Sequence, residues 1–239
     1  MYIDWLDIDS LEFPPTSEAL TEPNGLLAAG GDLSVNRLIR AYAQGIFPWF
    51  SEDEPIMWWS PSPRCVIFPD SFHASKSLRK LSRKSAFDIR FNTSFPQVIE
   101  ECSEERADQN GTWITEQMKS AYIELHQQGF AHSIEVFKDE NLVGGLYGVG
   151  IGGVFYGESM FSRMANTSKL ALYALSELMK QNNLLLIDCQ ATNDHLLSLG
   201  AEEIDREHFE NILKENLKQF GLSKIQLSTF FNSTNALSS

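Results

Sequence analysis

The sequence predicts a mixed α/β protein in which a small N-terminal region precedes a larger domain built on a mixed sheet. Three observations support this class. Helical and extended hydrophobic patterns alternate from about residue 63 onward, turn residues separate consecutive apolar strands between residues 133 and 156, and a short apolar run at 184–187 has the length of a buried strand. We therefore expect an N-terminal domain at 1–62, a main domain at 63–220 and a peripheral C-terminal tail at 221–239.

The N-terminal region contains one clear helical pattern. Asp32 or Ser34 can cap its start, apolar residues recur at helical spacing after the cap, and Gly45 can end it. The aromatic segments 46–50 and 57–63 that follow are interrupted by proline, which favours a loop or an edge strand.

The main domain is expected to combine helices with short strands. Isolated strands are expected at 65–68 and 87–91, and helices at 74–84, 94–104 and 115–128. Three consecutive antiparallel strands are expected at 133–137, 142–149 and 154–156, followed by a helix at 167–180 and the apolar strand at 184–187. The Ser-, Thr- and Asn-rich residues from about 222 onward are typical of a peripheral chain end.

The composition is typical of a soluble protein from a reducing compartment. Of 239 residues, 43% are hydrophobic and 21% are charged, which is ordinary for a globular protein. The three cysteines have no CxxC spacing, which favours neither a disulfide framework nor a zinc site. No apolar run is long enough to span a membrane, and the acidic N-terminus lacks the apolar region of a signal peptide. We expect a cytoplasmic protein without a bound metal.

One basic cluster contrasts with the net charge of −13. Lys76, Arg79, Lys80, Arg83 and Lys84 recur at i, i+3, i+4, i+7 and i+8, so a helix would carry all five on one face. Apolar residues fall on the opposite face of that helix. Such a face fits the phosphates of a nucleic acid, although a solvated surface helix explains the same pattern.

Several familiar motifs fail because of their context. The letters GxGxxG at 148–153 match a dinucleotide-binding fingerprint, but a strand follows them, whereas a bound phosphate needs a helix N-terminus. His126 and His132 are expected to have structural roles. Cys189 is either a nucleophile, for which no histidine partner can be assigned, or a small core residue, which is the simpler interpretation.

A polar cluster closes the last apolar strand. In extended geometry, Asp188 and Gln190 share one face and Cys189 faces the other. Glu158 also follows an apolar strand, and the carboxyl ends of strands are where ligands bind in open α/β sheets. The alternatives are that Asp188 caps a following helix and that Glu158 is an exposed turn residue. Together, the two carboxylates and the amide favour a functional site.

Six strings of the sequence carry a resemblance to a known family. They are Glu22-Pro-Asn-Gly-Leu-Leu-Ala-Ala-Gly-Gly-Asp-Leu, Gly45-Ile-Phe-Pro-Trp-Phe, Trp58-Trp-Ser-Pro, Gly111-Thr-Trp-Ile-Thr, Gly157-Glu-Ser-Met-Phe-Ser and Ile187-Asp-Cys-Gln. In this order, from residue 13 to about residue 210, the sequence resembles the leucyl/phenylalanyl-tRNA–protein transferase family. Two features depart from the family's pattern: Phe137 stands where Trp is common, and the tail beyond about residue 220 matches nothing firmly.

The resemblance implies a small N-terminal domain followed by a catalytic domain of the N-acetyltransferase-like (GNAT) fold. It also implies transfer of leucine or phenylalanine, and sometimes methionine, from aminoacyl-tRNA to proteins that begin with Arg or Lys, which marks them for degradation by the N-end rule. The donor is an ester and the product is an amide, so the transfer needs neither ATP nor a metal, and no cofactor is expected. We expect the enzyme to act as a monomer.

The resemblance also implies roles for the polar and aromatic residues. Asp188 would polarise Gln190, which receives the proton or holds the amine, and replacing Asp188 by Asn should slow the reaction while leaving folding nearly unchanged. Trp49 and Trp113 would flank the 3′-terminal adenine, although core packing would explain them without the resemblance. The acidic character of the site assigns recognition of the acceptor's positive charge chiefly to Glu158.

The donor's side chain needs an apolar pocket. Leu146, Phe155 and Ile187 lie on neighbouring strands of the inferred sheet and are expected to line it, while the basic helix would contact the tRNA. Two other classes remain as alternatives, an acetyl-CoA-dependent N-acetyltransferase and a noncatalytic tRNA-binding or degradation-adaptor protein. The first alternative needs a pyrophosphate site, and no glycine-rich stretch precedes a helix in this sequence.

Overall fold

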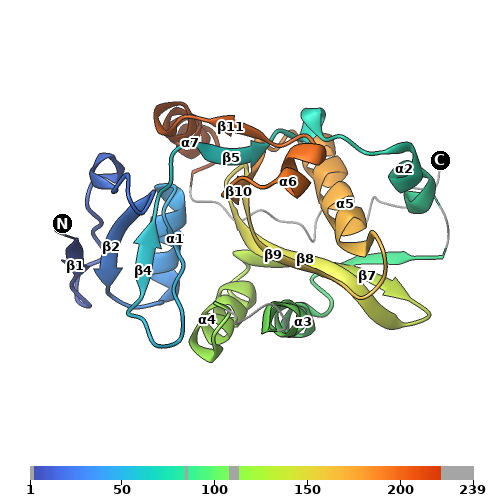
Figure 1. Cartoon of the computed structure of the whole chain (residues 1–239), viewed down its shortest axis with the longest axis horizontal. Helices are drawn as coiled ribbons and strands as arrows, with labels where there is room; N and C mark the ends of the chain where they lie inside the picture. The colour runs from blue at the N-terminus through green and yellow to red at the C-terminus, as the bar shows by residue number, and fades with distance from the viewer. Residues whose placement is uncertain (1–2, 84–85, 108–112, 222–239) are drawn as a thin grey trace.

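The computed structural model describes residues 3–83, 86–107 and 113–221, which form two sheets with helices on both faces of the larger one (Figure 1). The smaller sheet has the strand order β1-β2-β4-β3 and contains β1 (Asp4–Leu6), β2 (Leu26–Gly30), β3 (Phe47–Pro48) and β4 (Met57–Trp59). The larger sheet has the order β11-β5-β10-β9-β8-β7-β6 and mixes parallel with antiparallel pairs. The predicted mixed α/β class is confirmed.

The larger sheet is built from the middle and later parts of the chain. Its strands are β5 (Arg64–Ile67), β6 (Asp88–Phe91), β7 (Ala131–Lys138), β8 (Asn141–Ile151), β9 (Val154–Ser162), β10 (Leu186–Gln190) and β11 (Glu202–Ile204). The α-helices are α1 (Val35–Ala43), α2 (Lys76–Ser82), α3 (Phe95–Ala107), α4 (Glu116–Gln127), α5 (Thr167–Gln181), α6 (Asp194–Ser198) and α7 (Arg206–Phe220). Two short 3-10 turns lie at Thr16–Glu18 and Pro69–Ser71.

Helices begin where the sequence supplies a side chain that caps the free backbone N–H groups. Ser75 caps α2, Thr115 caps α4 and Asp205 caps α7, each by accepting a hydrogen bond from the backbone N–H three residues later. Of the two caps expected for α1, Ser34 is the one that accepts such a bond, and Asp32 instead accepts from the backbone N–H of Ser34.

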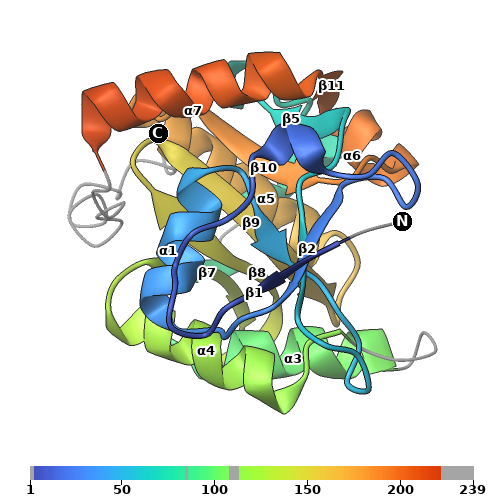
Figure 2. The ribbon, with the colours of Figure 1, turned by 90° about the vertical axis from the view of Figure 1, so that its left-hand side faces the viewer.

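The helices divide between the two faces of the larger sheet. α5 packs on one face with α2 beside it, and α3, α4 and α1 pack on the other (Figures 1 and 2). Each face of the sheet has its own buried cluster, and neighbouring residues of β8 contribute to both. Leu146 belongs to the cluster on the α5 side, and Tyr147 belongs to the cluster on the opposite side. The sheet is therefore buried on both faces along β7, β8 and β9.

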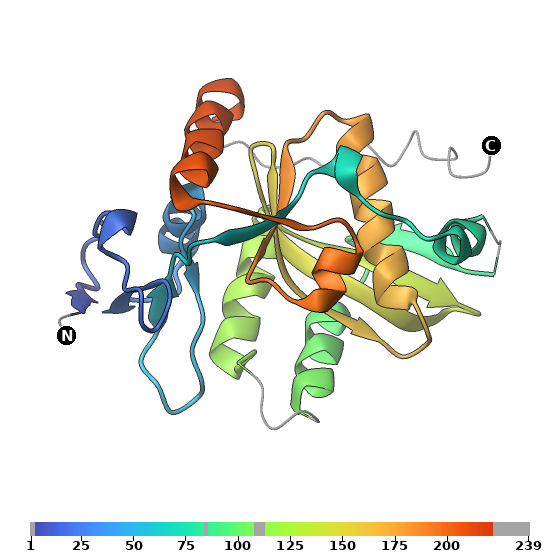
Figure 3. The ribbon, with the colours of Figure 1, turned by 45° about the horizontal axis from the view of Figure 1, so that its top comes forward.

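The N-terminal elements share a core with the larger sheet. Leu27 and Trp58 of the smaller sheet belong to the same buried cluster as Tyr147 of β8 and Phe209 of α7. Figure 3 shows α7 at the edge of the molecule, above the junction of the N-terminal elements and the larger sheet. The side-chain oxygen of Asn216 on α7 accepts a hydrogen bond of 2.7 Å from a backbone N–H in the β8–β9 turn. The domain boundary that we propose after residue 62 falls in the link from β4 to β5. The buried core continues from one side of this link to the other.

Several elements differ from the sequence-based expectations. The segment 57–63 contains β4, which lies between β2 and β3, so it is an interior strand of the smaller sheet and not a loop or an edge. β9 extends to Ser162, well past the apolar residues 154–156, and the expected strand at 184–187 is displaced to 186–190. The elements β1, β2, β11 and α7 were not predicted. The tail beyond residue 221 lies outside the described residues.

The described residues offer neither a membrane-spanning helix nor a metal cluster. None of their helices is both long enough and apolar enough to cross a lipid bilayer. Within the same ranges, no group of three or more His, Cys, Asp or Glu side chains is placed to hold a metal ion.

Candidate active site

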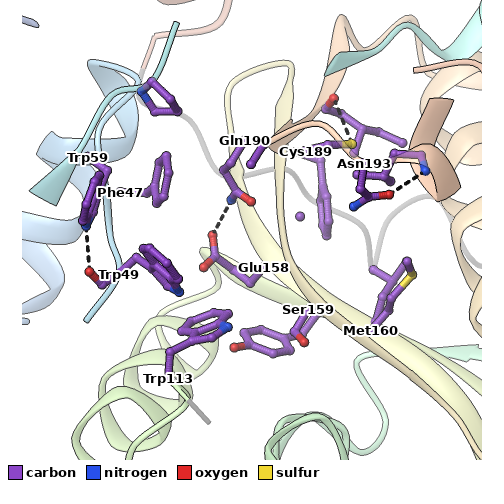
Figure 4. A pocket seen from close by; sticks show the side chains of 18 of the residues that line it. Phe47, Trp49, Trp59, Trp113, Glu158, Ser159, Met160, Cys189, Gln190 and Asn193 are labelled. Carbon is purple, nitrogen blue, oxygen red and sulfur yellow. Dashed lines mark hydrogen bonds between the residues drawn. The ribbon is translucent and has the colours of Figure 1, made fainter. Parts of the chain in front are cut away.

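A cavity of about 370 Å³ lies where β9 and β10 separate (Figure 4). The two strands pair in parallel from Leu186 and Val154 to Asp188 and Tyr156; beyond that point β9 continues beside β8, and β10 continues beside β5. The residues that follow the last pair on each strand line the cavity. Its lining consists of Asn24, Phe47, Pro48, Trp49, Trp59, Pro61, Trp113, Leu146, Tyr147, Phe155, Gly157, Glu158, Ser159, Met160, Leu172, Leu175, Ile187, Cys189, Gln190, Ala191, Asn193 and Leu196.

The cavity brings together most of the residues expected at the site. These are Trp49, Trp113, Leu146, Phe155, Glu158, Ile187 and Gln190. Asp188 is not part of the lining, and neither are the cations of α2 that the structure describes. Cys189, which was expected to face away from Gln190, lines the cavity beside it.

Glu158 is the buried acid of the cavity. It is the extra residue of a β-bulge, because the pairing of β9 with β8 skips it. Only 8% of the residue is exposed, and its carboxylate accepts hydrogen bonds from the hydroxyls of Tyr42 on α1 (2.8 Å) and Tyr122 on α4 (3.0 Å). The two tyrosine hydroxyls also contact each other. Glu158 is therefore not an exposed turn residue, and its position depends on helices from both parts of the chain.

The electrostatic environment of Glu158 favours its neutral form. Burial raises the pKa of Glu158 to about 7, although the hydrogen bonds from Tyr42 and Tyr122 oppose this rise. The nearby charge of Asp188 raises the pKa further, and the charge of Arg64 lowers it. A carboxyl group with such a pKa gains and loses its proton near neutral pH, which is typical of functional sites.

Asp188 is fully buried and paired with a buried cation. The guanidinium of Arg64 on β5 donates to both carboxylate oxygens, from Nε to Oδ1 at 2.8 Å and from Nη2 to Oδ2 at 2.7 Å. Oδ1 also accepts the backbone N–H of Gln190 at 3.0 Å. The expectation that Asp188 shares a face with Gln190 is wrong. The capping alternative for Asp188 is also wrong, since Asn193 caps α6.

Gln190 ends β10 with a positive φ of +60°, directly after the shift in register between Asp188 and Gln190. For a residue other than glycine, this backbone conformation costs roughly 1–3 kcal/mol, so the surrounding contacts must hold it. The backbone bond to Asp188 is one such contact. The side chain turns toward β9, where Nε2 donates to Oε1 of Glu158 at 3.2 Å (Figure 4). Asp188 thus contacts the backbone N–H of Gln190, and Glu158 contacts the side-chain amide of Gln190.

Three tryptophans form the aromatic side of the cavity. Trp49 is 49% exposed, its ring centroid lies 5.5 Å from that of Trp59, and its carbonyl oxygen accepts a 2.7 Å hydrogen bond from Nε1 of Trp59. Figure 4 shows Trp113 next to Trp49, close to the pair formed by Glu158 and Gln190. The exposure of Trp49 contradicts the core-packing alternative for that residue, whereas Trp113 packs partly against the core.

The deeper part of the cavity is apolar. Phe155 and Ile187 are direct neighbours across the parallel pair of β9 and β10, and Leu146 lies on β8. Helices α5 and α6 close this part with further leucines, Leu172, Leu175 and Leu196. A slot of this kind accepts an apolar side chain and rejects a charged one, because burial of an unpaired charge is costly.

Helix α2 presents its cations to solvent, as the spacing predicted. The exposed side chains are Lys76, Arg79, Lys80 and Arg83, and Leu78 on the opposite face is buried. The helix ends at Ser82, so Arg83 is its C-terminal cap and not part of its last turn. Lys84 lies outside the described residues.

Several residues of the site were not anticipated. Trp59 stands inside one of the six sequence strings that carry the family resemblance, and Arg64 follows that string closely. Their position in or near this string was a signal that the sequence offered. For Tyr42 and Tyr122 the sequence contained only a weak signal, which is a hydroxyl group on the apolar face of a helix. Asn193 lines the cavity at the start of α6, where its side-chain oxygen accepts from the backbone N–H three residues later.

The motifs set aside on context have structural roles. The glycines at 148–153 belong to β8 and to the turn into β9. His126 stacks on Phe95 with ring centroids 4.3 Å apart, and its Nδ1 lies 2.8 Å from a backbone carbonyl oxygen. Burial lowers the pKa of His132 to about 3, so this histidine is uncharged near neutral pH.

Comparison with known proteins gives a consistent result. The family model described as leucyl/phenylalanyl-tRNA protein transferase matches residues 66–214, and the model of that family's N-terminal domain matches residues 31–62. A leucyl/phenylalanyl-tRNA–protein transferase from Pseudomonas fluorescens (strain SBW25) is 53% identical over 217 residues, covering 91% of this chain and 96% of that protein. One from Pseudoalteromonas atlantica is 58% identical over 209 residues, covering 87% and 89%. Among solved structures, an aminoglycoside acetyltransferase from an uncultured soil metagenomic sample covers 47% of this chain and 83% of its own, with a TM-score of 0.37 and 15% identity.

Proposed function

The chain belongs to the leucyl/phenylalanyl-tRNA–protein transferase family, and we propose that it transfers leucine or phenylalanine, and also methionine, to acceptor proteins that begin with Arg or Lys. Membership of this family makes the protein an aminoacyltransferase that uses aminoacyl-tRNA. The proposal extends to its biological setting: the enzyme is a cytoplasmic monomer, and the added residue marks the acceptor for N-end-rule degradation.

The composition of the cavity carries this proposal. One space of about 370 Å³ combines an apolar slot, three tryptophans and the buried pair of Glu158 and Gln190. An aminoacyl-adenosine end has the matching parts, which are an apolar side chain, a planar base and an ester carbon. The acceptor contributes a cation, for which Glu158 offers a carboxylate of low solvent exposure.

The reaction exchanges an ester for an amide. The lone pair of the acceptor's α-amine attacks the carbonyl carbon of the aminoacyl ester, a C–N bond forms, and the C–O bond to the terminal ribose breaks. One proton leaves the amine, and the ribose oxygen gains one. The α-amine has a pKa of roughly 7.7–8.0, so its neutral form is available near pH 7. The enzyme's task is mainly to position two substrates and stabilise the developing charge.

The contacts of the site suggest separate roles for the three polar residues. Nε2 of Gln190 donates to Glu158, which leaves the amide oxygen of Gln190 to accept a hydrogen bond from the attacking amine. Glu158 provides the counter-charge for the acceptor. Asp188 is a positioning residue, because its carboxylate holds the backbone of Gln190 and does not line the cavity.

The aromatic residues are assigned to the nucleoside. Trp49 and Trp113 lie together at the side of the cavity, with Trp49 half-exposed, and we assign them to the faces of the terminal adenine. Stacking of a base on an aromatic side chain contributes about 1–3 kcal/mol. Trp59 supports this arrangement, since its ring and its hydrogen bond fix the position of Trp49.

One assay tests the proposed function against its alternatives. Purified protein is incubated with labelled leucyl-tRNA and an Arg-initiated peptide, without acetyl-CoA, and the peptide is expected to gain one leucine. An Ala-initiated peptide is the matched acceptor control and should react far less. Acetylation on addition of acetyl-CoA, in place of leucylation, would identify a small-molecule acetyltransferase. Binding of the tRNA without any product would identify a noncatalytic protein.

Replacing Phe155 by Ala should weaken discrimination between leucine and valine as donors. Phe155 forms part of the apolar slot, and shape differences of one methyl group are worth only about 1–3 kcal/mol in such pockets, so selectivity should be reduced in a graded way. The measurement is the ratio of kcat/KM for leucyl- and valyl-adenosine. Ile67→Ala is the control, because Ile67 is equally buried on β5 but does not line the cavity. An unchanged ratio in the Phe155 variant would remove this residue from the donor pocket.

Reversing the charges of Lys80 and Arg83 to Glu should weaken the use of aminoacyl-tRNA. Both side chains are exposed on α2, and each lost phosphate contact should reduce the slope of log K against log salt by about 0.9. Use of an aminoacyl-adenosine should change little, since it has no tRNA body. Reversing Lys214 and Lys218 on α7 gives the same change in net charge elsewhere on the surface and serves as control. Equal losses with both donors would contradict a tRNA contact at α2.

A further inference from the structure

Cys65 and Cys189 lie next to each other beside the cavity. Cys65 is a fully buried residue of β5, and Cys189 is a partly exposed residue of β10 that lines the cavity. In the antiparallel pairing of these strands, Cys65 is opposite Gln190, and the register shift after Asp188 leaves Cys189 as the extra residue. A bulge places two residues of one strand against one residue of its partner. Cys189 and Gln190 therefore both oppose Cys65.

Cys65 also belongs to the apolar cluster on the α5 side of the sheet, and Cys189 packs against the same cluster. A hydrogen bond between the two thiols lowers the pKa of Cys65 against the effect of burial, and the same bond together with burial raises the pKa of Cys189. Cys102, the third cysteine, lies on α3 in the core on the other face of the sheet. The pair thus combines three features: the two cysteines oppose each other across β5 and β10, the pKa of Cys65 is lowered, and Cys189 has access to solvent through the cavity.

We propose that Cys65 and Cys189 form a redox modification site, in which a disulfide between them reversibly reduces activity at the adjoining cavity. The reactant is a small disulfide such as oxidised glutathione. The inference about activity rests on the proposed transferase function, whereas formation of the bond does not.

The modification is a sequence of two thiol–disulfide exchanges. In the first, the sulfur of Cys189, which faces the cavity, forms a bond to one glutathione sulfur while its proton passes to the other, and the glutathione disulfide breaks to release one glutathione thiol. The raised pKa of the Cys189 thiol slows this step. In the second, the thiolate of Cys65 attacks the sulfur of Cys189, the protein disulfide forms, and the second glutathione leaves. The two thiol protons of the protein end on the two released glutathione molecules. The protein loses two electrons, and the glutathione disulfide gains them.

The disulfide would act on the cavity through Gln190. Formation of the bond draws the sulfur of Cys189 toward β5 and away from the cavity, and Gln190 is the next residue in the chain. Its positive φ is held by the backbone bond to Asp188, and its amide contacts Glu158 at 3.2 Å. A displacement of this peptide weakens both contacts. Because a misplacement of about 1 Å in a reacting group can cost roughly 10²-fold in rate, a small shift is sufficient to slow the reaction.

The test oxidises the full chain with oxidised glutathione and follows two independent readouts. The first is the intact mass and a non-reducing peptide map, which should show the loss of two hydrogen atoms and a cross-link between the peptides containing Cys65 and Cys189. The second is leucyl transfer to an Arg-initiated peptide, which should fall on the order of tenfold or more and recover with dithiothreitol. Cys65→Ser should stop at a mixed disulfide between Cys189 and glutathione without the cross-link, Cys189→Ser should give neither product, and Cys102→Ser should behave as the parent.

The outcomes separate the two parts of the inference. In the parent protein, a mixed glutathione adduct without the cross-link, or a cross-link that involves Cys102, would overturn the site. A mapped bond between Cys65 and Cys189 with unchanged activity would overturn its effect on the cavity. If Cys65→Ser folds poorly, Cys65→Ala is the second variant, with the same expected absence of a cross-link. A reduced parent protein without any leucyl transfer would refute the proposed function, and the mass and peptide map would still decide whether the bond forms.

Discussion

Replacing Asp188 by Asn is expected to destabilise the protein by about 3–5 kcal/mol and to lower kcat by roughly 10²-fold. The loss of stability follows from Arg64, which is fully buried and would keep its charge without a counter-charge. The new amide group would also direct its N–H₂ toward Nη2 of Arg64, so two donors would face each other. The sequence alone led us to expect nearly unchanged folding, and the buried pair is the reason to expect a loss of stability instead.

A double variant separates the structural role of Asp188 from its effect on the reaction. Replacing a buried ion pair by apolar residues of similar volume is often neutral or stabilising, so Arg64→Met with Asp188→Leu should recover much of the lost stability. It should not recover kcat, because a leucine side chain offers no acceptor for the backbone N–H of Gln190. Urea unfolding and steady-state kinetics on the parent, the single variant and the double variant provide the measurements. A stable double variant with the parent's kcat would show that Asp188 does not position Gln190.

Much of the fold followed from local patterns. The antiparallel strands β7 and β8, the helices α4 and α5, and the two faces of α2 were marked by hydrophobic period and by turn or cap residues. β9 was predicted too short because Glu158 and Ser159 interrupt its apolar run, and the contacts that bury Glu158 come from α1 and α4, which no local pattern shows. α7 was missed although its signals were present: Asp205 caps it, and Phe209 and Leu213 recur at helical spacing.

The site shows a sharper limit of sequence-based inference. Alternation along a regular strand predicted that Asp188 and Gln190 face one way and Cys189 the other. The register shift in β10 and the positive φ of Gln190 change this alternation, and both are set by pairing with β5, more than 120 residues earlier in the chain. The partners of Glu158 are also remote, since Tyr42 lies 116 residues away. Most of the residues named for the site line one cavity, but their contacts required the structure.

The raised pKa of Glu158 gives a testable pH dependence of stability. A glutamate in the unfolded chain has a pKa near 4.5, and burial raises the pKa of Glu158 to about 7, so the folded protein binds this proton more tightly. The resulting stabilisation is fully present below about pH 4.5 and is lost as the pH rises through about 7, a change worth roughly 3 kcal/mol. Glu158→Gln lacks this ionisation. The variant's stability relative to the parent should therefore improve as the pH is raised from 5 to 8, as measured by urea unfolding at each pH.

The same replacement tests whether Glu158 recognises the acceptor's cation. The ionised carboxylate attracts an N-terminal Arg or Lys, so in the parent the ratio of kcat/KM for an Arg-initiated over an Ala-initiated peptide should rise with pH through about 7. Both peptides have an α-amine of similar pKa, so the titration of the attacking group cancels in this ratio. In Glu158→Gln this ratio should be independent of pH. It should be lower than in the parent by a factor equivalent to roughly 1.5–3 kcal/mol. The Leu/Val donor preference should be unchanged. A ratio that keeps the parent's magnitude and pH dependence in a folded Gln variant would exclude Glu158 as the counter-charge.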